Sequence, residues 1–150
     1  MTIRFYETDG PFGCFSNFSA HPVTIAGKVW PTTEHYFQAQ KFAGTPHEEE
    51  VRAAKSPMVA ARMGRSRARP LRHDWETVKD AVMRVAVEAK VRQHADVREA
   101  LLSTGTEELV EASQKDSYWG CGADGKGRNR LGHILMEVRA ALRSEPATSR

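Results

Sequence analysis

Three polar side chains of different chemistry follow one another in the stretch from Trp30 to Phe42. Glu34, Gln38 and Lys41 stand at positions i, i+4 and i+7. At 100° per residue, a helix would place this carboxylate, amide and amine on one narrow stripe. Such a stripe can bind a small polar substrate and move protons on it. The alternative is a solvated glutamate and lysine on a surface helix, and spacing alone favours that alternative.

A cluster of basic side chains lies further along the chain. Five arginines fall within eleven residues: Arg62, Arg65, Arg67, Arg69 and Arg72. Guanidinium groups match the geometry of phosphate oxygens, so the cluster can bind a phosphate or a DNA backbone. A solvated basic turn explains it equally well. The net charge of +3 and the pI near 9.0 permit a phosphorylated or nucleic-acid ligand without requiring one.

A second stretch with chemical potential runs from Asp116 to Gly132 and is rich in glycine. Gly120, Gly122 and Gly125 match the pattern G-x-G-x-x-G. No apolar strand precedes them and no βαβ unit surrounds them, so a dinucleotide-binding fold is excluded. A loop with accessible N–H groups that leads into a helix can still bind an anion. A turn-rich connection without function is an equally good interpretation.

The elements expected to position these residues are mostly helices. Periodicity and capping signals predict helices over residues 30–42, 45–54, 57–64, 75–93 and 96–103, and a last one after residue 132. Short apolar runs predict strands at residues 3–6, 22–25 and 28–30, the last two joined as a hairpin, and an extended segment at 108–111. The helix at 75–93 should be central to the core, with a stripe that includes Val78, Val82 and Val85 on its buried face.

Size and composition narrow the class of protein. A chain of 150 residues with 40% hydrophobic and 27% charged residues is expected to form one globular domain. No apolar run reaches the roughly 20 residues of a membrane span, and the N-terminus lacks the apolar segment of a signal peptide, so we expect a cytoplasmic protein. Cys14 and Cys121 are expected to be free thiols. No histidine stands at zinc-ligand spacing with them, and no metal or other cofactor is expected.

Four segments together resemble the NADAR domain family, the YbiA-like N-glycosidases. They are residues 15–18 (FSNF), residues 30–42 (WPTTEHYFQAQKF), residues 72–75, and residues 116–132 with their continuation to Arg139. The resemblance runs from about Arg4 to Arg139. Because several long motifs occur in the same order, the match is more specific than any single pattern in the chain.

The resemblance implies a mainly helical α+β fold with a small N-terminal β-sheet or hairpin. The domain would span residues 1–143, and residues 144–150 would be a disordered tail. It also implies hydrolysis of an N-glycosidic bond at ribose C1′. Members of the family act on phosphoribosyl-aminopyrimidine intermediates of riboflavin biosynthesis or remove ADP-ribose from guanine in nucleic acid.

The resemblance also assigns roles to residues. Glu34 would do acid/base or ribose-binding work, and Lys41 would attack C1′. Residues expected to bind or support the substrate are Asn17, Phe18, Gln38, Trp75, Asp116, Trp119, Gly120, Gly122 and Asn129. Arg65, Arg67 and Arg72 are expected to bind phosphate. From the sequence alone, Trp75 is either a core anchor or a stacking surface, and the role of Cys121 stays open.

The chemistry sets a condition on Lys41. A nucleophilic amine must be neutral, and with an ordinary pKa of ~10.4 only about one lysine in 2,500 is neutral at pH 7. Burial would lower that pKa, whereas a charged Glu34 nearby would raise it. Three functions are compatible with the sequence: a glycosidase that removes ADP-ribose from guanine in DNA, a glycosidase that acts on a phosphoribosyl-aminopyrimidine, and a non-catalytic ADP-ribose-binding module. The oligomeric state is left open.

Overall fold

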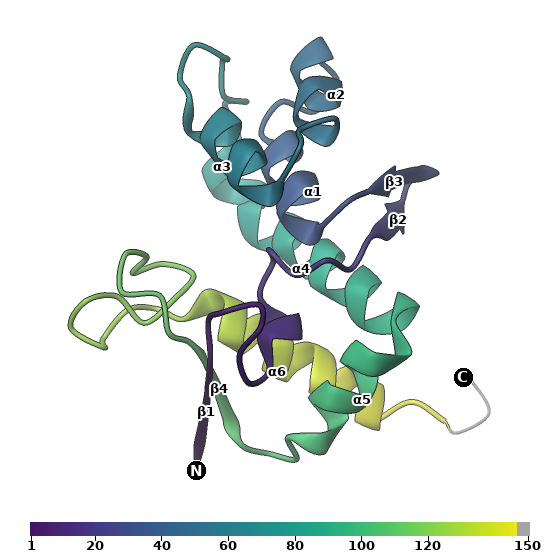
Figure 1. Cartoon of the computed structure of the whole chain (residues 1–150), viewed down its shortest axis with the longest axis vertical. Coiled ribbons are helices and arrows are strands. Elements are labelled where there is room, and N and C mark those ends of the chain that lie inside the picture. The colour runs from purple at the N-terminus through teal and green to yellow at the C-terminus, as the bar shows by residue number, and fades with distance from the viewer. Residues whose placement is uncertain (147–150) are drawn as a thin grey trace. The chain divides into compact units, whose positions relative to one another are not determined.

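The computed structural model describes residues 1–146, so the predicted tail at 144–150 lies outside the described residues from 147 onward. The chain packs as two units. One unit runs from Asn17 to Gln93, and the other combines Met1–Ser16 with the chain from His94 onward. Figure 1 labels the helices and strands of both units. Every predicted site residue before Gln93 belongs to the first of them, and those from Asp116 onward belong to the second.

The unit 17–93 is built around a short helix, α1 (Thr33–Gln40). The helices α2 (Pro46–Arg52), α3 (Pro57–Arg65) and α4 (Trp75–Gln93) all pack against it. Thr32, Thr45 and Ser56 cap the first three helices with side-chain oxygens that accept backbone N–H groups of the first turn. The core of this unit consists of Val23, Trp30, Ala39, Phe42, Val51 and Ala60.

The predicted hairpin is confirmed in the same unit. Strands β2 (Val23–Ile25) and β3 (Lys28–Trp30) pair antiparallel. Ala26 and Gly27 both have positive φ, 54° and 78°, as the two central residues of a type I′ hairpin turn require. Gln93 at the end of α4 bonds the free edge of β2: its Nε2 donates to Thr24 O and its Oε1 accepts from Thr24 N, both at 2.8 Å. The side-chain amide thus replaces a neighbouring strand.

Two details of the predicted helices are wrong. α4 has the predicted ends, and Ala86 of the predicted stripe is buried, but the other buried apolar residues are Trp75, Met83, Val87 and Val91, while Val85 is 44% exposed. The helix predicted at residues 57–64 was expected to end at Gly64, yet α3 continues to Arg65. Gly64 is there because α3 approaches α1 closely: an added Cβ would lie 1.9 Å from Gln38 Oε1.

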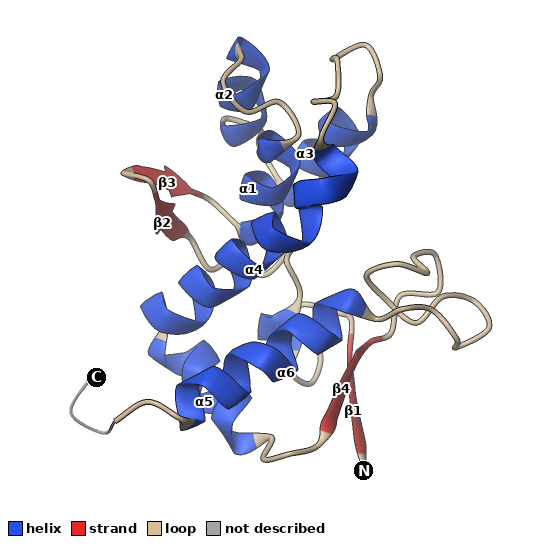
Figure 2. Ribbon diagram, turned by 180° about the vertical axis from the view of Figure 1, so that it is seen from behind, coloured by secondary structure: helices blue, strands red, loops and turns tan. Residues whose placement is uncertain are grey.

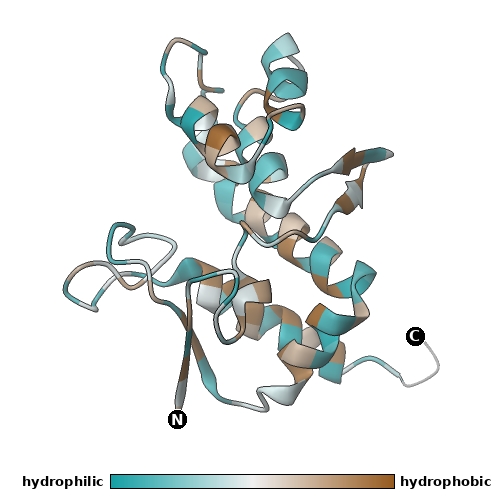
Figure 3. Ribbon diagram, viewed as in Figure 1, coloured by the Kyte–Doolittle hydropathy of each residue, from teal (hydrophilic) through white to brown (hydrophobic). Residues whose placement is uncertain are grey.

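The second unit contains a strand pair and two helices within its described residues. Strand β1 (Thr2–Phe5) pairs in parallel with β4 (Glu108–Glu111), and the two lie side by side in Figure 2. A 3-10 turn, η1, spans Gly13–Phe15. Helices α5 (Ala95–Ser103) and α6 (Arg130–Arg143) pack against each other, and α6 also contacts β4. Brown and teal bands alternate along α6 in Figure 3, as expected of an amphipathic helix.

The buried face of α6 is apolar except at one position. Leu131, Ile134, Leu135 and Val138 are each at most 1% exposed. Arg139 is also buried, and its guanidinium donates to Thr104 Oγ1 at 2.7 Å and to Glu107 O at 2.8 Å. These bonds satisfy a charged group that burial would otherwise destabilise.

The architecture confirms the predicted fold class. Within residues 1–146 the chain has six α-helices and two separate two-stranded sheets, which is a mainly helical α+β fold. The four strands are short, and only one of the two sheets is a hairpin. Among the described residues, no helix is both long enough and apolar enough to span a membrane.

Candidate active site

The start of α1 is fixed by a set of buried hydrogen bonds. Thr32 Oγ1 accepts the N–H of His35 at 3.1 Å and lies 2.8 Å from its Nδ1, while His35 Nε2 is 3.0 Å from Ala54 O. Because a carbonyl only accepts, Nε2 carries the proton and Nδ1 accepts from the threonine hydroxyl. Burial lowers the pKa of His35, which favours this neutral ring. His35 therefore joins α1 to the segment after α2.

Asn17 holds the same helix start from another side. Its backbone oxygen accepts Glu34 N at 3.1 Å, and its Oδ1 accepts the Thr33 hydroxyl at 2.8 Å. Its Nδ2 lies 3.3 Å from the sulfur of Met83 on α4. Asn17 thus fixes the position of Glu34. Phe18, the next residue, is half-buried, and the predicted substrate contacts of both residues stay predictions.

Glu34 and Gln38 form a buried pair on the predicted stripe. Glu34 is 8% and Gln38 6% exposed, and Gln38 Nε2 donates to Glu34 Oε2 at 2.8 Å. The other amide atom, Gln38 Oε1, is buried, and no hydrogen-bond partner is found for it among the described residues. It faces the bare Cα of Gly64. The amide therefore orients the carboxylate of Glu34, and α3 fixes the amide.

Lys41 follows the last residue of α1, and its amine lies between two rings and a carbonyl. Nζ is 5.9 Å from the ring centre of Phe37 and 5.8 Å from that of Trp75, and the two rings contact each other edge-on at 5.1 Å. Nζ also donates to Gly64 O at 3.4 Å. Trp75 is 5% exposed, so it is both a core anchor and one wall beside the amine.

The surroundings of Lys41 lower its pKa to about 8. Burial among the rings is the largest cause, and the positive charge of Arg67 is the next. Glu34 acts in the opposite direction, while Arg65 and Lys79 add smaller effects that favour the neutral amine. The condition set by the sequence, that a nucleophilic lysine must lose its proton easily, is met by this environment.

The predicted phosphate-binding arginines occupy different surroundings. Arg67 donates through Nη2 to Gly64 O, the same carbonyl that accepts Lys41 Nζ, and Arg65 is exposed at the end of α3. Arg72 makes two bonds to the carboxylate of Asp74, at 2.6 and 3.0 Å, and its backbone N–H donates to Lys41 O at 3.0 Å. Arg72 therefore anchors the chain before α4 to the end of α1.

In the second unit, two predicted site residues use their side chains to hydrogen-bond nearby backbone groups. Asp116 Oδ1 accepts the N–H groups of Tyr118 and Trp119 at 2.9 and 2.8 Å. Asn129, at φ 51°, is 7% exposed. Its Oδ1 accepts Glu111 N at 2.9 Å, and its Nδ2 donates to Leu109 O at 2.8 Å. Asn129 therefore holds the end of the loop on β4, and Asp116 bonds within the loop.

Two glycines of the loop allow its backbone to pack closely against neighbouring backbone. Gly120 is buried, and a Cβ there would meet Glu111 O at 3.0 Å. The N–H of Gly122, which has φ 71°, donates to Ser113 O at 3.0 Å and to Asp116 O at 3.1 Å. This N–H is therefore not free for an anion. The ring of Trp119 is half-buried against that of Tyr118, at 4.8 Å.

Comparisons with known proteins show which family the chain belongs to. The model of the NADAR domain matches residues 4–143. The chain belongs to the NADAR family. It is 56% identical to N-glycosidase YbiA of Escherichia coli K12 over 143 residues, 95% of this chain and 89% of that protein. The NMR structure of the E. coli protein YbiA superposes with a TM-score of 0.88 at 55% identity, covering 95% of this chain and 85% of that one.

A further relative is larger. The riboflavin biosynthesis protein of Vibrio vulnificus is 44% identical over 140 residues, which are 93% of this chain but 38% of that protein. The prediction of a hydrolase that acts on N-glycosyl bonds is confirmed, whereas the choice of glycosyl substrate is not decided by these relatives.

The NADAR domain brings part of the predicted set together. Glu34, Gln38, Lys41, Trp75 and Arg67 lie around the contact of α1 with α3 and α4. Sequence reasoning assigned no site role to Gly64, a neighbour of Lys41, and took it only for a helix stop. The signal for Gly64 was available, since a glycine inside a helix destabilises it unless another element passes close by.

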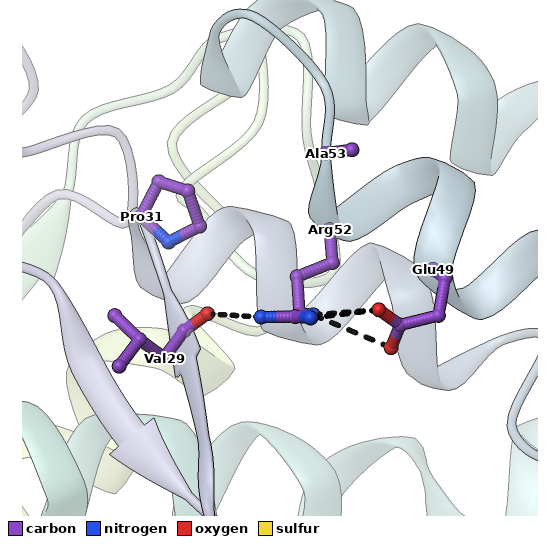
Figure 4. A pocket seen from close by; sticks show the side chains of 5 residues that line it. All are labelled: Val29, Pro31, Glu49, Arg52 and Ala53. Atoms are coloured by element: carbon purple, nitrogen blue, oxygen red, sulfur yellow. Dashed lines mark hydrogen bonds and ion pairs between the residues drawn. The ribbon is translucent and has the colours of Figure 1, made fainter.

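A surface hollow of this NADAR domain shares no residue with that group. Val29, Pro31, Glu49, Arg52 and Ala53 line it, and Figure 4 shows the Arg52 guanidinium between Val29 and Glu49. Arg52 donates to Val29 O at 3.0 Å and to Glu49 Oε1 at 2.7 Å. These bonds tie the hairpin to α2, so the hollow is a structural junction.

The two cysteines fit the expectation of free thiols. Cys121 is buried, and its Sγ lies 3.5 Å from Gly122 O and 3.8 Å from Ser113 O. Cys121 is therefore part of the packing of the loop.

Proposed function

We propose that this NADAR domain removes ADP-ribose from guanine in DNA by hydrolysing the N-glycosidic bond at ribose C1′, with Lys41 as nucleophile and Glu34 as base. The observation that carries the proposal is an amine with a pKa of about 8 on the same short helix as a buried carboxylate. Together they supply a nucleophile and a proton acceptor.

The lowered pKa decides whether Lys41 can act near neutral pH. With a pKa of about 8, about one molecule in ten carries a neutral amine at pH 7, against about one in 2,500 for an ordinary lysine. This is a gain of more than a hundredfold in reactive molecules. The rings of Phe37 and Trp75 provide the burial that causes most of it.

The reaction follows from these groups. The neutral amine of Lys41 adds to C1′, the C1′–N bond to the base breaks, and the leaving nitrogen takes up a proton. Loss of the extra proton from the lysine nitrogen gives a glycosylamine; its remaining N–H proton then passes to O4′ as the C1′–O4′ bond breaks and the ribose opens, and water hydrolyses the resulting imine to free sugar and free amine. Glu34 accepts the proton from lysine and returns it to the leaving nitrogen. The bond from Gln38 holds one oxygen of Glu34 in place for this transfer.

The choice of ADP-ribose is supported by positive charge next to Lys41. Arg65 and Arg67 are exposed and close enough to influence its pKa. Two guanidinium groups suit the two phosphates of ADP-ribose, and the net charge of +3 favours approach to DNA.

A phosphoribosyl-aminopyrimidine is the alternative substrate, and the name of the Vibrio vulnificus relative favours it. The same lysine and carboxylate would cleave its bond at C1′, and the arginines would bind its single phosphate. Salt separates the two substrates, because contacts with a DNA backbone weaken steeply as salt rises and contact with one phosphate weakens less.

The test is the release of free ADP-ribose from ADP-ribosylated guanine in a DNA oligonucleotide. Wild type and Lys55→Ala, which removes an exposed lysine, should release it, whereas Glu34→Ala and Lys41→Ala should not. No release by wild type would reject this substrate, and the phosphoribosyl-aminopyrimidine would be assayed in the same way. Binding of either compound without turnover would instead identify a non-catalytic module.

A further inference from the structure

Two cationic side chains share one carbonyl in the unit 17–93. Lys41 Nζ donates to Gly64 O at 3.4 Å, and Arg67 Nη2 donates to the same oxygen. Gly64 lies in the last turn of α3, where helix carbonyls lack a following N–H partner and carry the negative end of the helix dipole. One acceptor thus holds an ammonium and a guanidinium close together.

The guanidinium of Arg67 is bonded to two backbone carbonyls. Its Nη2 donates to Gly64 O, and its Nε donates to Arg65 O at 3.4 Å. A guanidinium keeps its proton throughout the range in which proteins fold, whereas an amine can lose one. The repulsion between the two cations is therefore relieved by deprotonation of Lys41.

All charged groups that influence Lys41 can be placed on their elements. Glu34 on α1 favours the charged amine. Arg65 at the end of α3, Arg67 beyond it and Lys79 on α4 favour the neutral one. Lys79 is paired with Glu76 at 2.6 Å, which offsets its charge. Arg67 has the largest effect of these charges.

We propose that Arg67 is a positioning residue for Lys41, whose guanidinium occupies the Gly64 carbonyl and whose fixed charge favours the neutral form of the amine. The sequence assigned Arg67 only to phosphate binding. The catalytic meaning of this role rests on the proposed function, whereas the effect on the proton of Lys41 does not. A phosphate bound by Arg67 would offset part of this effect.

The first test measures the proton of Lys41 directly and needs no substrate. Protein labelled with ¹³C at lysine Cε is titrated by NMR, and the Lys41 signal is assigned by its absence in Lys41→Gln. Arg67→Gln should raise the pKa of Lys41 by roughly 0.5 to 1 unit. Arg67→Lys, which keeps the charge, should stay within roughly 0.3 unit of wild type. Arg62→Gln, which removes an exposed arginine on α3, should leave the pKa of Lys41 unchanged.

The same variants separate this role from phosphate binding. If Arg67 acts through Lys41, Arg67→Gln lowers turnover roughly three- to tenfold at pH 7 and reaches the wild-type rate at high pH, with little change in KM. If Arg67 only binds phosphate, KM rises at every pH. An unchanged Lys41 titration in Arg67→Gln would overturn the proposal, as would an equal shift in Arg67→Lys. Because Arg67 is exposed, its variants should fold, which a thermal melt confirms.

Discussion

The two predicted constellations use polar residues in opposite ways. Around α1, the amine of Lys41 lies against rings with its pKa lowered to about 8, and one amide oxygen of Gln38 lies buried without a hydrogen-bond partner among the described residues. In the glycine-rich loop, the oxygens and amide of Asp116 and Asn129 are bonded to nearby backbone. Buried polar groups that lack hydrogen-bond partners or have shifted pKa values indicate chemistry. Buried polar groups that are fully hydrogen-bonded indicate a role in stabilising the fold.

The largest expected effect concerns Lys41, in the region around α1. Lys41→Ala should lower turnover at least ~1,000-fold, about 4 kcal/mol of transition-state free energy. Borohydride added during turnover should trap a sugar on wild-type protein but not on the variant, as measured by intact mass. Near-normal turnover of the variant, together with no trapped adduct on wild type, would replace the imine route by a mechanism with Glu34 alone.

The second largest effect concerns the stability that Asn129 of the glycine-rich loop contributes. Asn129→Ala removes the partners of Glu111 N and Leu109 O, and leaving these groups unbonded should lower the free energy of unfolding by about 2–4 kcal/mol. Urea unfolding measures it. Asn129→Gly, which tolerates φ 51°, controls for backbone strain and should lose nearly as much.

The same variant can break the comparison. If Asn129→Ala raises KM at a temperature where it is fully folded, Asn129 also contacts substrate, as the family resemblance implies. An unchanged KM would confine Asn129 to holding the loop on β4.

The pH dependence of turnover tests the state of Lys41. Because the reactive form is neutral and its pKa is about 8, the single-turnover rate should rise about tenfold from pH 6 to pH 7 and level off above pH 8. A rate that is flat from pH 6 to pH 8 would show that deprotonation of Lys41 is not needed.

The smallest effect concerns stability. The folded pKa of Lys41, about 8, lies below the unfolded value, so the folded state loses this proton first and stability rises with pH between the two values. At pH 7 both states are protonated, and the folded one keeps an ammonium in an unfavourable place. Lys41→Met should therefore stabilise the protein at pH 7 by about 1–2 kcal/mol, after allowance for solvent screening.

The control for this effect is a lysine in solvent. Urea unfolding of Lys41→Met and of Lys55→Met, at an exposed position, should give a gain for the first and none for the second. The gain should shrink as pH approaches 10. A Lys41→Met protein less stable than wild type at pH 7 would contradict the unfavourable burial of the charge.

Local signals predicted much of the fold. The caps at Thr45 and Ser56, the Ala26–Gly27 turn and the ends of α4 all follow from chemistry within a few residues. The buried face of α4 did not, because Val85 and Met83 are both apolar and only the neighbouring elements decide which one is covered. The parallel pairing of β1 with β4 joins segments too far apart for any local pattern.

The site was predictable as a list of residue types on one helix. The helix period placed Glu34, Gln38 and Lys41 together, and the structure shows the first two bonded. The approach of Gly64 and Arg67 to Lys41 depends on how α3 packs on α1, which no spacing within either helix encodes. The sequence therefore placed the candidate reactive groups on one helix but did not predict the contacts of Gly64 and Arg67 with Lys41.

The pairing of Thr2 with Glu108 has a consequence for synthesis of the chain. During translation strand β1 emerges from the ribosome about a hundred residues before its partner exists, whereas α2, α3 and α4 pack on α1 within the unit 17–93. Strand β1 is thus made long before it can pair. An amino-terminal fusion or a pause in translation before residue 108 should disturb β1 while leaving the helices that carry Lys41 able to form.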